Sequence, residues 1–115
     1  MLRASHAGAT LWPEAIPALP GALALAEQGI ESTLAPENSR VLTGMGRDAT
    51  TALLADPQTS GGLLAGIPAG KAVACVAALR AAGMEAAIIG VVEPEREGAP
   101  AIRLAPEPDL PLFSR

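Results

Sequence analysis

One nine-residue stretch gathers most of the side chains in this chain that are suited to ligand contact: Asp56-Pro57-Gln58-Thr59-Ser60-Gly61-Gly62-Leu63-Leu64. Gln58, Thr59 and Ser60 supply uncharged amide and hydroxyl groups for hydrogen bonding. Gly61 and Gly62 permit positive φ angles and a close approach of main chain to a ligand. Successive N–H groups in such a turn can form an anion-binding nest. A tight helix-to-strand connection is the commoner interpretation, and both stay open; no Lys follows the glycines, so the stretch is not a Walker A loop.

The remaining candidates for chemistry are isolated residues. Asp56 can cap the loop or hold a metal ion, and capping is the favoured interpretation. Asn38 and Arg40 are the most capable side chains of the irregular stretch 30–48, and a loop of that length is usually functional or mobile. Cys75 lies mid-helix between apolar residues, which predicts a buried structural thiol. His6 has no Cys or acidic residue at ligand spacing, so no metal site is predicted.

Composition excludes several classes of function. The chain has 115 residues and a net charge of −4, which argues against a surface for nucleic acid or acidic membranes. Its aromatic residues are Trp12 and Phe113, too few for stacking on bases. A single cysteine, Cys75, allows no internal disulfide and favours a reducing compartment. The sequence shows neither a membrane-spanning apolar run nor a signal-peptide core. We therefore expect a cytoplasmic protein with no nucleic-acid and no membrane partner.

Hydrophobic periodicity and turn residues predict the elements that position these side chains. Asp48 is a candidate helix N-cap, Gly29 and Gly83 are candidate helix ends, and Pro20 suits a first helical turn. Charged residues at 93–97 predict a solvated turn. The expected strands cover 9–12, 63–67, 86–92 and 101–104, and the expected helical segments cover 20–28, 36–42, 51–54 and 71–82.

These elements predict an α/β (α+β) fold with a mixed sheet and helices on one face. Strand 63–67, helix 71–82 and strand 86–92 would form a split βαβ-like unit. Strand 86–92 is apolar on both faces, so we expect it to be central and covered. The expected domain covers residues 1–105, and prolines mark 106–115 as an extended tail.

The stretch from Asp56 to Leu64 resembles the signature near the C-terminal end of selenide, water dikinase (selenophosphate synthetase). The flanking sequences are similar too: Ile16-Pro17-Ala18-Leu19-Pro20-Gly21-Ala22 resembles the family's proline-rich lead into a helix. Downstream, Ala78-Leu79-Arg80-Ala81-Ala82-Gly83 followed by Ala87-Ile88-Ile89-Gly90 resembles its closing helix and strand. The resemblance covers roughly residues 1–94. It implies the C-terminal α/β domain of the aminoimidazole-ribotide-synthetase-like superfamily, truncated at its N-terminus and lacking the N-terminal ATP-binding domain.

The resemblance also implies a reaction. The family transfers phosphorus from ATP to selenide with Mg²⁺, giving selenophosphate, AMP and phosphate. Its reactive Cys, partner Lys and metal-binding Asp belong to the N-terminal part, so no catalytic or metal residue carries over to this chain. What carries over is a ligand or domain-interface loop made of Asp56, Gln58, Thr59, Ser60, Gly61 and Gly62. The segment holding Asn38 and Arg40 would lie near the domain interface, with solvated loop residues as an equal alternative.

We therefore expect the C-terminal domain of a selenophosphate-synthetase-like phosphotransferase. ATP and Mg²⁺ would serve the full-length family, and this chain alone would hold no cofactor and be non-catalytic. Its expected partner is an N-terminal ATP-binding domain, covalent or separate, and the family allows a homodimer. The alternatives are a free-standing scaffold or binding module that docks a separate ATP-binding partner, and a gene remnant.

Overall fold

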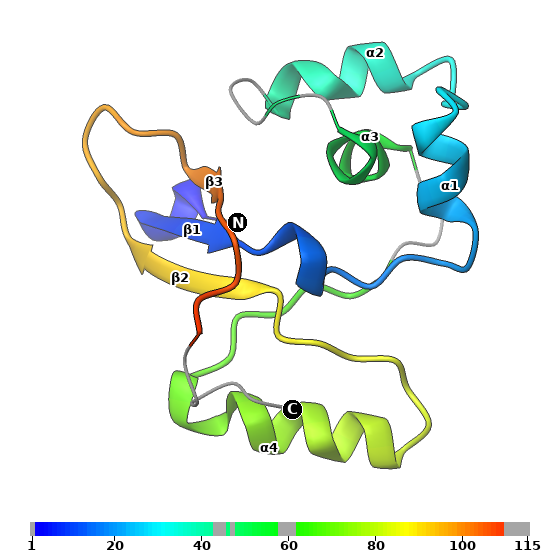
Figure 1. Ribbon diagram of the computed structural model, residues 1–115. Helices are drawn as coiled ribbons and strands as arrows, with labels where there is room; N and C mark the ends of the chain where they lie inside the picture. Colours follow the sequence, from blue (N-terminus) through cyan, green and yellow to red (C-terminus); the bar gives the residue numbers. More distant parts are fainter. Residues whose placement is uncertain (1, 43–45, 47, 58–61, 110–115) are drawn as a thin grey trace. The chain divides into compact units, whose positions relative to one another are not determined.

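The structure, a computed structural model, describes residues 2–42, 46, 48–57 and 62–109 (Figure 1). The chain divides into two compact units. The sheet unit comprises residues 1–17 and 65–115, and the helical unit comprises residues 18–64. The sheet unit is therefore built from both ends of the chain, and the helical unit is one continuous segment. The predicted single domain over 1–105 stays a prediction.

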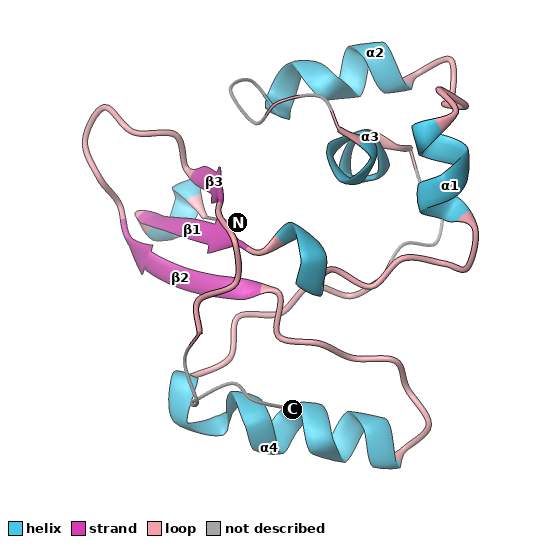
Figure 2. Ribbon diagram, in the orientation of Figure 1, coloured by secondary structure: helices cyan, strands magenta, loops and turns pink. Residues whose placement is uncertain are grey.

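The sheet unit contains a three-stranded mixed sheet in the order β2-β1-β3. β1 (Ala7–Leu11) pairs antiparallel with β2 (Gly90–Pro94) and parallel with β3 (Ile102–Leu104), as Figure 2 shows. The predicted α+β class with a mixed sheet is confirmed. The prediction that 86–92 is the central strand is wrong, because β1 occupies the centre. Apolar residues on both faces of 86–92 did not reveal that only its last part pairs, from Gly90 onward.

Gly90 is the point of closest approach between β1 and β2. A Cβ atom built on Gly90 would lie 2.9 Å from Leu11 Cα and 3.0 Å from Leu11 Cδ2, and it would overlap the Thr10 carbonyl oxygen. Main-chain atoms cannot turn aside as a flexible side chain can. Only glycine fits this position of the sheet.

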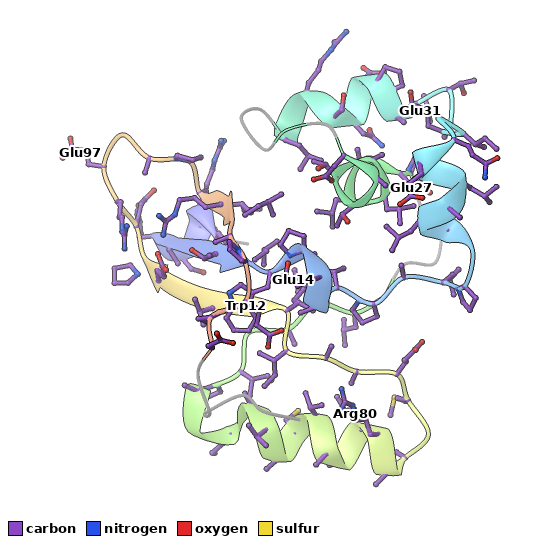
Figure 3. All side chains as sticks on the ribbon, in the orientation of Figure 1. Trp12, Glu14, Glu27, Glu31, Arg80 and Glu97 are labelled. Atoms are coloured by element: carbon purple, nitrogen blue, oxygen red, sulfur yellow. The ribbon has the colours of Figure 1, made fainter. Side chains whose placement is uncertain are left out.

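Trp12 anchors the small core of the sheet unit. Its side chain is the largest fully buried one among the described residues, at 2% exposure, and Ala9 of β1 is buried at 7%. The Trp12 N–H donates to the Ile89 carbonyl at 2.9 Å, which continues the β1–β2 pairing beyond the strands. Short 3₁₀ helices precede and follow β1, at Arg3–Ser5 and Pro13–Ala15. Figure 3 shows Trp12 and Glu14 beside the sheet.

Helix α4 (Ala69–Ala81) confirms the longest predicted helix. Gly83 follows it with φ of +80°, as expected of a residue that ends a helix. Ala72, Cys75, Val76 and Leu79 are half-buried and fall at helical spacing, whereas no residue of α4 is fully buried. Cys75 is therefore half-buried rather than buried. None of the helices described is long and apolar enough to cross a membrane.

The predicted strand 63–67 is wrong. Residues 62–68, all described, contain no strand. The side chain of Leu63 is 97% exposed and that of Leu64 is 58% exposed. A strand needs a neighbour for its main-chain hydrogen bonds, and the expected neighbour, 86–92, pairs with β1 instead. The split βαβ-like unit does not form in the described chain.

The helical unit consists of α1 (Ala22–Glu27), α2 (Ala35–Asn38), the 3₁₀ helix Ser39–Leu42 and α3 (Ala49–Ala55). All the helical segments predicted between residues 20 and 54 are thus present. Pro20 lies before the N-cap Gly21 rather than in the first turn. Gly29 has φ of +75° just after α1, as its predicted helix-ending role requires. Among the described residues of this unit, Ala35, Thr51 and Ala55 are buried.

Candidate functional site

Helix α3 leads directly into the predicted signature stretch. Asp48 is its N-cap: the Asp48 carboxylate accepts hydrogen bonds from the Thr51 hydroxyl at 2.6 Å and from the Thr51 N–H at 2.8 Å. These two bonds, the hydroxyl first, lower the pKa of Asp48, because they stabilise the charged carboxylate. The predicted cap is confirmed. It fixes the start of the helix whose other end delivers the signature residues.

The C-terminal end of α3 confirms the predicted helix stop. Ala55 is the last helical residue, and Asp56 turns to extended backbone with φ of −63° and ψ of 130°. Pro57 follows, and the residue before a proline is biased towards extended backbone. Gln58, Thr59, Ser60 and Gly61 lie outside the described residues, so their predicted role in a ligand or interface loop stays a prediction. Gly62 is exposed and in irregular backbone.

The structure brings together Asn38 and the start of this stretch. The Asn38 side-chain Nδ2 donates a hydrogen bond to the Ala55 carbonyl oxygen at 3.0 Å. Ala55 directly precedes Asp56, so two candidates from separate parts of the sequence meet at one end of α3. Arg40 is exposed in the 3₁₀ helix Ser39–Leu42.

A polar cluster on the sheet was missed from the sequence. It joins one residue from each strand: Thr10 on β1, Glu93 on β2 and Arg103 on β3. Arg103 Nη2 donates to Glu93 Oε2 at 2.7 Å and to the Thr10 hydroxyl at 3.1 Å, and that hydroxyl donates to Glu93 Oε1 at 3.1 Å. Arg96 Nη2 lies 3.5 Å from Glu93 Oε2.

Glu93 therefore corrects the prediction of a solvated turn over 93–97. Burial raises the pKa of Glu93, but the Thr10 hydrogen bond and the Arg103 charge outweigh it, and the net pKa is lowered. Residues 95–97 are exposed as predicted, and Figure 3 shows Glu97 on the turn between β2 and β3. The missed signal was one polar residue beside or within each of three expected strands, with opposite charges on two of them.

Metal-ligating side chains do not gather in the part of the chain that the structure describes. There, no group of three or more His, Cys, Asp and Glu residues could hold a metal ion. His6 Nδ1 lies 3.4 Å from Glu95 Oε2, and both side chains are largely exposed. No chemical step is assigned to a metal ion at the described residues.

A small mixed sheet, and a helix that ends at Asp-Pro, define an α+β protein of the class that the sequence predicts. Comparison with known proteins shows what the chain is similar to. The chain is 41% identical over 104 residues to selenide, water dikinase of Myxococcus xanthus, matching 85% of this chain and 30% of that protein. It is 41% identical over 110 residues to selenide, water dikinase of Rhizobium meliloti, and 40% over 101 residues to that of Cronobacter sakazakii. No protein-family model matches the chain.

The predicted resemblance is confirmed. Over 84–90% of its length this chain is similar to part of three selenide, water dikinases. It spans about three tenths of the length of these curated relatives.

Proposed function

We propose that this chain is the C-terminal α+β part of a selenophosphate-synthetase-like phosphotransferase. The full-length reaction would convert ATP, selenide and water to selenophosphate, AMP and phosphate. The observation that carries the proposal is the similarity of 40–41% identity over most of the chain to three selenide, water dikinases. The helix end at Asp56 is compatible with it, because the helix predicted to stop at Pro57 leads into the signature stretch. The single cysteine favours a cytoplasmic location.

In this proposal the chain alone does not catalyse the reaction. Phosphoryl transfer depends on positioned metal ions and cationic groups around the phosphates. The match to about three tenths of each relative supports a division of labour in which those groups belong to the remaining part. The role of this chain would be to complete the fold and to present the Asp56–Gly62 loop to a phosphate-bearing ligand or to the ATP-binding domain.

The direct test is an assay of AMP and selenophosphate formation from ATP, selenide and Mg²⁺. The selenide, water dikinase of Myxococcus xanthus serves as the positive control under the same conditions. We expect AMP from the relative and none above background from this chain. Production of both AMP and selenophosphate by the purified chain would contradict the non-catalytic proposal.

A second candidate function is a binding module that docks a separate ATP-binding partner. The observation that favours it is the exposure of large apolar side chains within the sheet unit: Ile67, Val73 and Met84 are 42–53% exposed. Apolar surface of this kind marks interaction sites.

The docking function can be tested by complementation. The Myxococcus xanthus relative is prepared without the stretch that this chain matches, and this chain is added separately. Restored AMP formation would support docking. A chain that sediments as a monomer in the mixture and restores nothing would count against it. The reading frame upstream of the gene tests the remaining alternative, a gene remnant, because a contiguous ATP-binding half argues against a remnant.

A further inference from the structure

We propose that Asn38 is a positioning residue that fixes the direction in which the chain leaves α3 towards Asp56. The proposal rests on the proposed function only in giving Asp56 and the residues after it a ligand or a partner. Its structural basis is the hydrogen bond from Asn38 Nδ2 to the Ala55 carbonyl, 3.0 Å long and partly buried, between residues 17 positions apart.

The Ala55 carbonyl needs a partner from outside its own helix. The last carbonyl groups of an α-helix have no N–H donor within the helix. The helix cannot continue past Asp56, because Pro57 biases that residue to extended backbone. Ala55 is only 5% exposed, and a buried carbonyl without a hydrogen bond is costly. The side-chain amide of Asn38 supplies this bond.

Small residues let the short Asn38 side chain reach α3. Asn38 is the last residue of α2, whose first residue, Ala35, is 2% exposed. Ala35 and Ala55 are both buried, and each carries only a methyl group as its side chain. The contact therefore depends on packing between α2 and α3 and on one amide of the right length.

The hydrogen bond constrains Asp56 from its N-terminal side. The Asp56 N–H donates to the Leu53 carbonyl at 3.2 Å, and the carbonyl just before it is held by Asn38. The peptide unit that joins Ala55 to Asp56 is thus fixed at both its oxygen and its nitrogen. Asn38 itself would touch no ligand; it would act through the orientation of this peptide.

The test uses two isosteric substitutions in the full 115-residue chain. Asn38→Asp removes the donor and sets an oxygen against the Ala55 carbonyl. Gln28→Glu is the matched control: Gln28, the C-cap of α1, also donates from Nε2 to a main-chain carbonyl at 3.0 Å, that of Ala24, but only four residues away and in an exposed position. Each change adds one negative charge. Hydrogen exchange is followed at single amides by NMR.

We expect N38D to speed hydrogen exchange of the Asp56 amide roughly tenfold and to have a smaller effect on the amides inside α1. We expect Q28E to leave the exchange rate of the Asp56 amide unchanged. Equal acceleration throughout residues 49–56 and in α1 would show a merely structural role for Asn38, and an unchanged Asp56 amide would also overturn the proposal. If N38D does not fold, Asn38→Ala removes the same donor without the charge and carries the same comparison.

A binding arm separates this inference from the proposed function. Thermal melts of the wild-type chain are recorded with and without inorganic pyrophosphate, since a ligand of the folded state raises the midpoint. Where the wild-type chain responds, we expect N38D to reduce the shift and Q28E to retain it, and equal shifts in both would contradict a positioning role. Where the wild-type chain does not respond, the phosphate role of the loop is refuted, and the exchange data still decide the role of Asn38.

Discussion

The substitution Gly90→Ala tests the close approach of β1 and β2. The added Cβ would meet Leu11 Cα at 2.9 Å and the Thr10 carbonyl, both main-chain atoms of the central strand. Relief requires the two strands to shift, and overpacking of this kind costs about 1–3 kcal/mol. For a domain near this size, each kcal/mol lowers the melting midpoint by roughly 4–8 °C. We expect the melting midpoint of the sheet unit to fall by an amount on the order of 5–20 °C.

The assay uses the only tryptophan of the chain. Trp12 lies in the sheet unit at 2% exposure, so its fluorescence reports on the unfolding of that unit rather than of residues 18–64. Gly70→Ala is the matched control, because a Cβ at Gly70 of α4 meets nothing within 4 Å and alanine favours a helix by up to about 1 kcal/mol. The fluorescence midpoint should fall for Gly90→Ala and hold or rise for Gly70→Ala. Equal midpoints in the two variants would refute the argument from close approach.

Two further predictions concern groups whose pKa is lowered. Asp48→Ala should destabilise the helical unit by about 1 kcal/mol. The loss is measured as a lower midpoint when the helical circular dichroism is followed during melting. Because folding lowers the pKa of Asp48, the stability that its carboxylate contributes is present above about pH 4 and is lost as the pH falls through the pKa of the folded state. Thr10→Val removes a hydrogen bond that lowers the pKa of Glu93. The Trp12 fluorescence midpoint at pH 7 should fall, and its decrease between pH 7 and pH 3 should become smaller than in the wild-type chain; an unchanged decrease would separate Glu93 from acid stability.

Local signals in the sequence predicted much of the fold. Asp48 was identified as a cap because an N-cap carboxylate bonds to N–H groups only two or three residues further along the chain, so the local sequence is enough to recognise it. Gly83 was identified as a helix end for the same reason, since a positive φ is a property of one residue. The alternation of residues 101–104 likewise placed β3 to within a residue at its start.

Strand pairing between distant residues could not be predicted from such local signals. An apolar run such as 63–67 is suited to a buried strand, but only a neighbour makes it one. The order β2-β1-β3 depends on which segments meet, and a two-residue period carries no such information.

The features of the candidate site that depend on neighbouring residues were predicted, and those that depend on distant residues were not. The end of α3 before Asp56 followed from Pro57, a local effect. The hydrogen bond from Asn38 to Ala55 spans 17 residues, and the sequence marked Asn38 only as a capable side chain. The Thr10–Glu93–Arg103 cluster needed the register of three strands before its members could be joined.

The pairing of β1 with β2 and β3 has a consequence for synthesis of the chain. β1 is made before both of its partners, which begin at Gly90 and Ile102. At a rate of about 5–20 residues per second, roughly 4–16 s pass before the ribosome has made β2. The helical unit, residues 18–64, is one continuous segment and has been made well before then. We therefore expect residues 18–64 to collapse before β1 meets its partners, and the sheet to form only after β3 has been made.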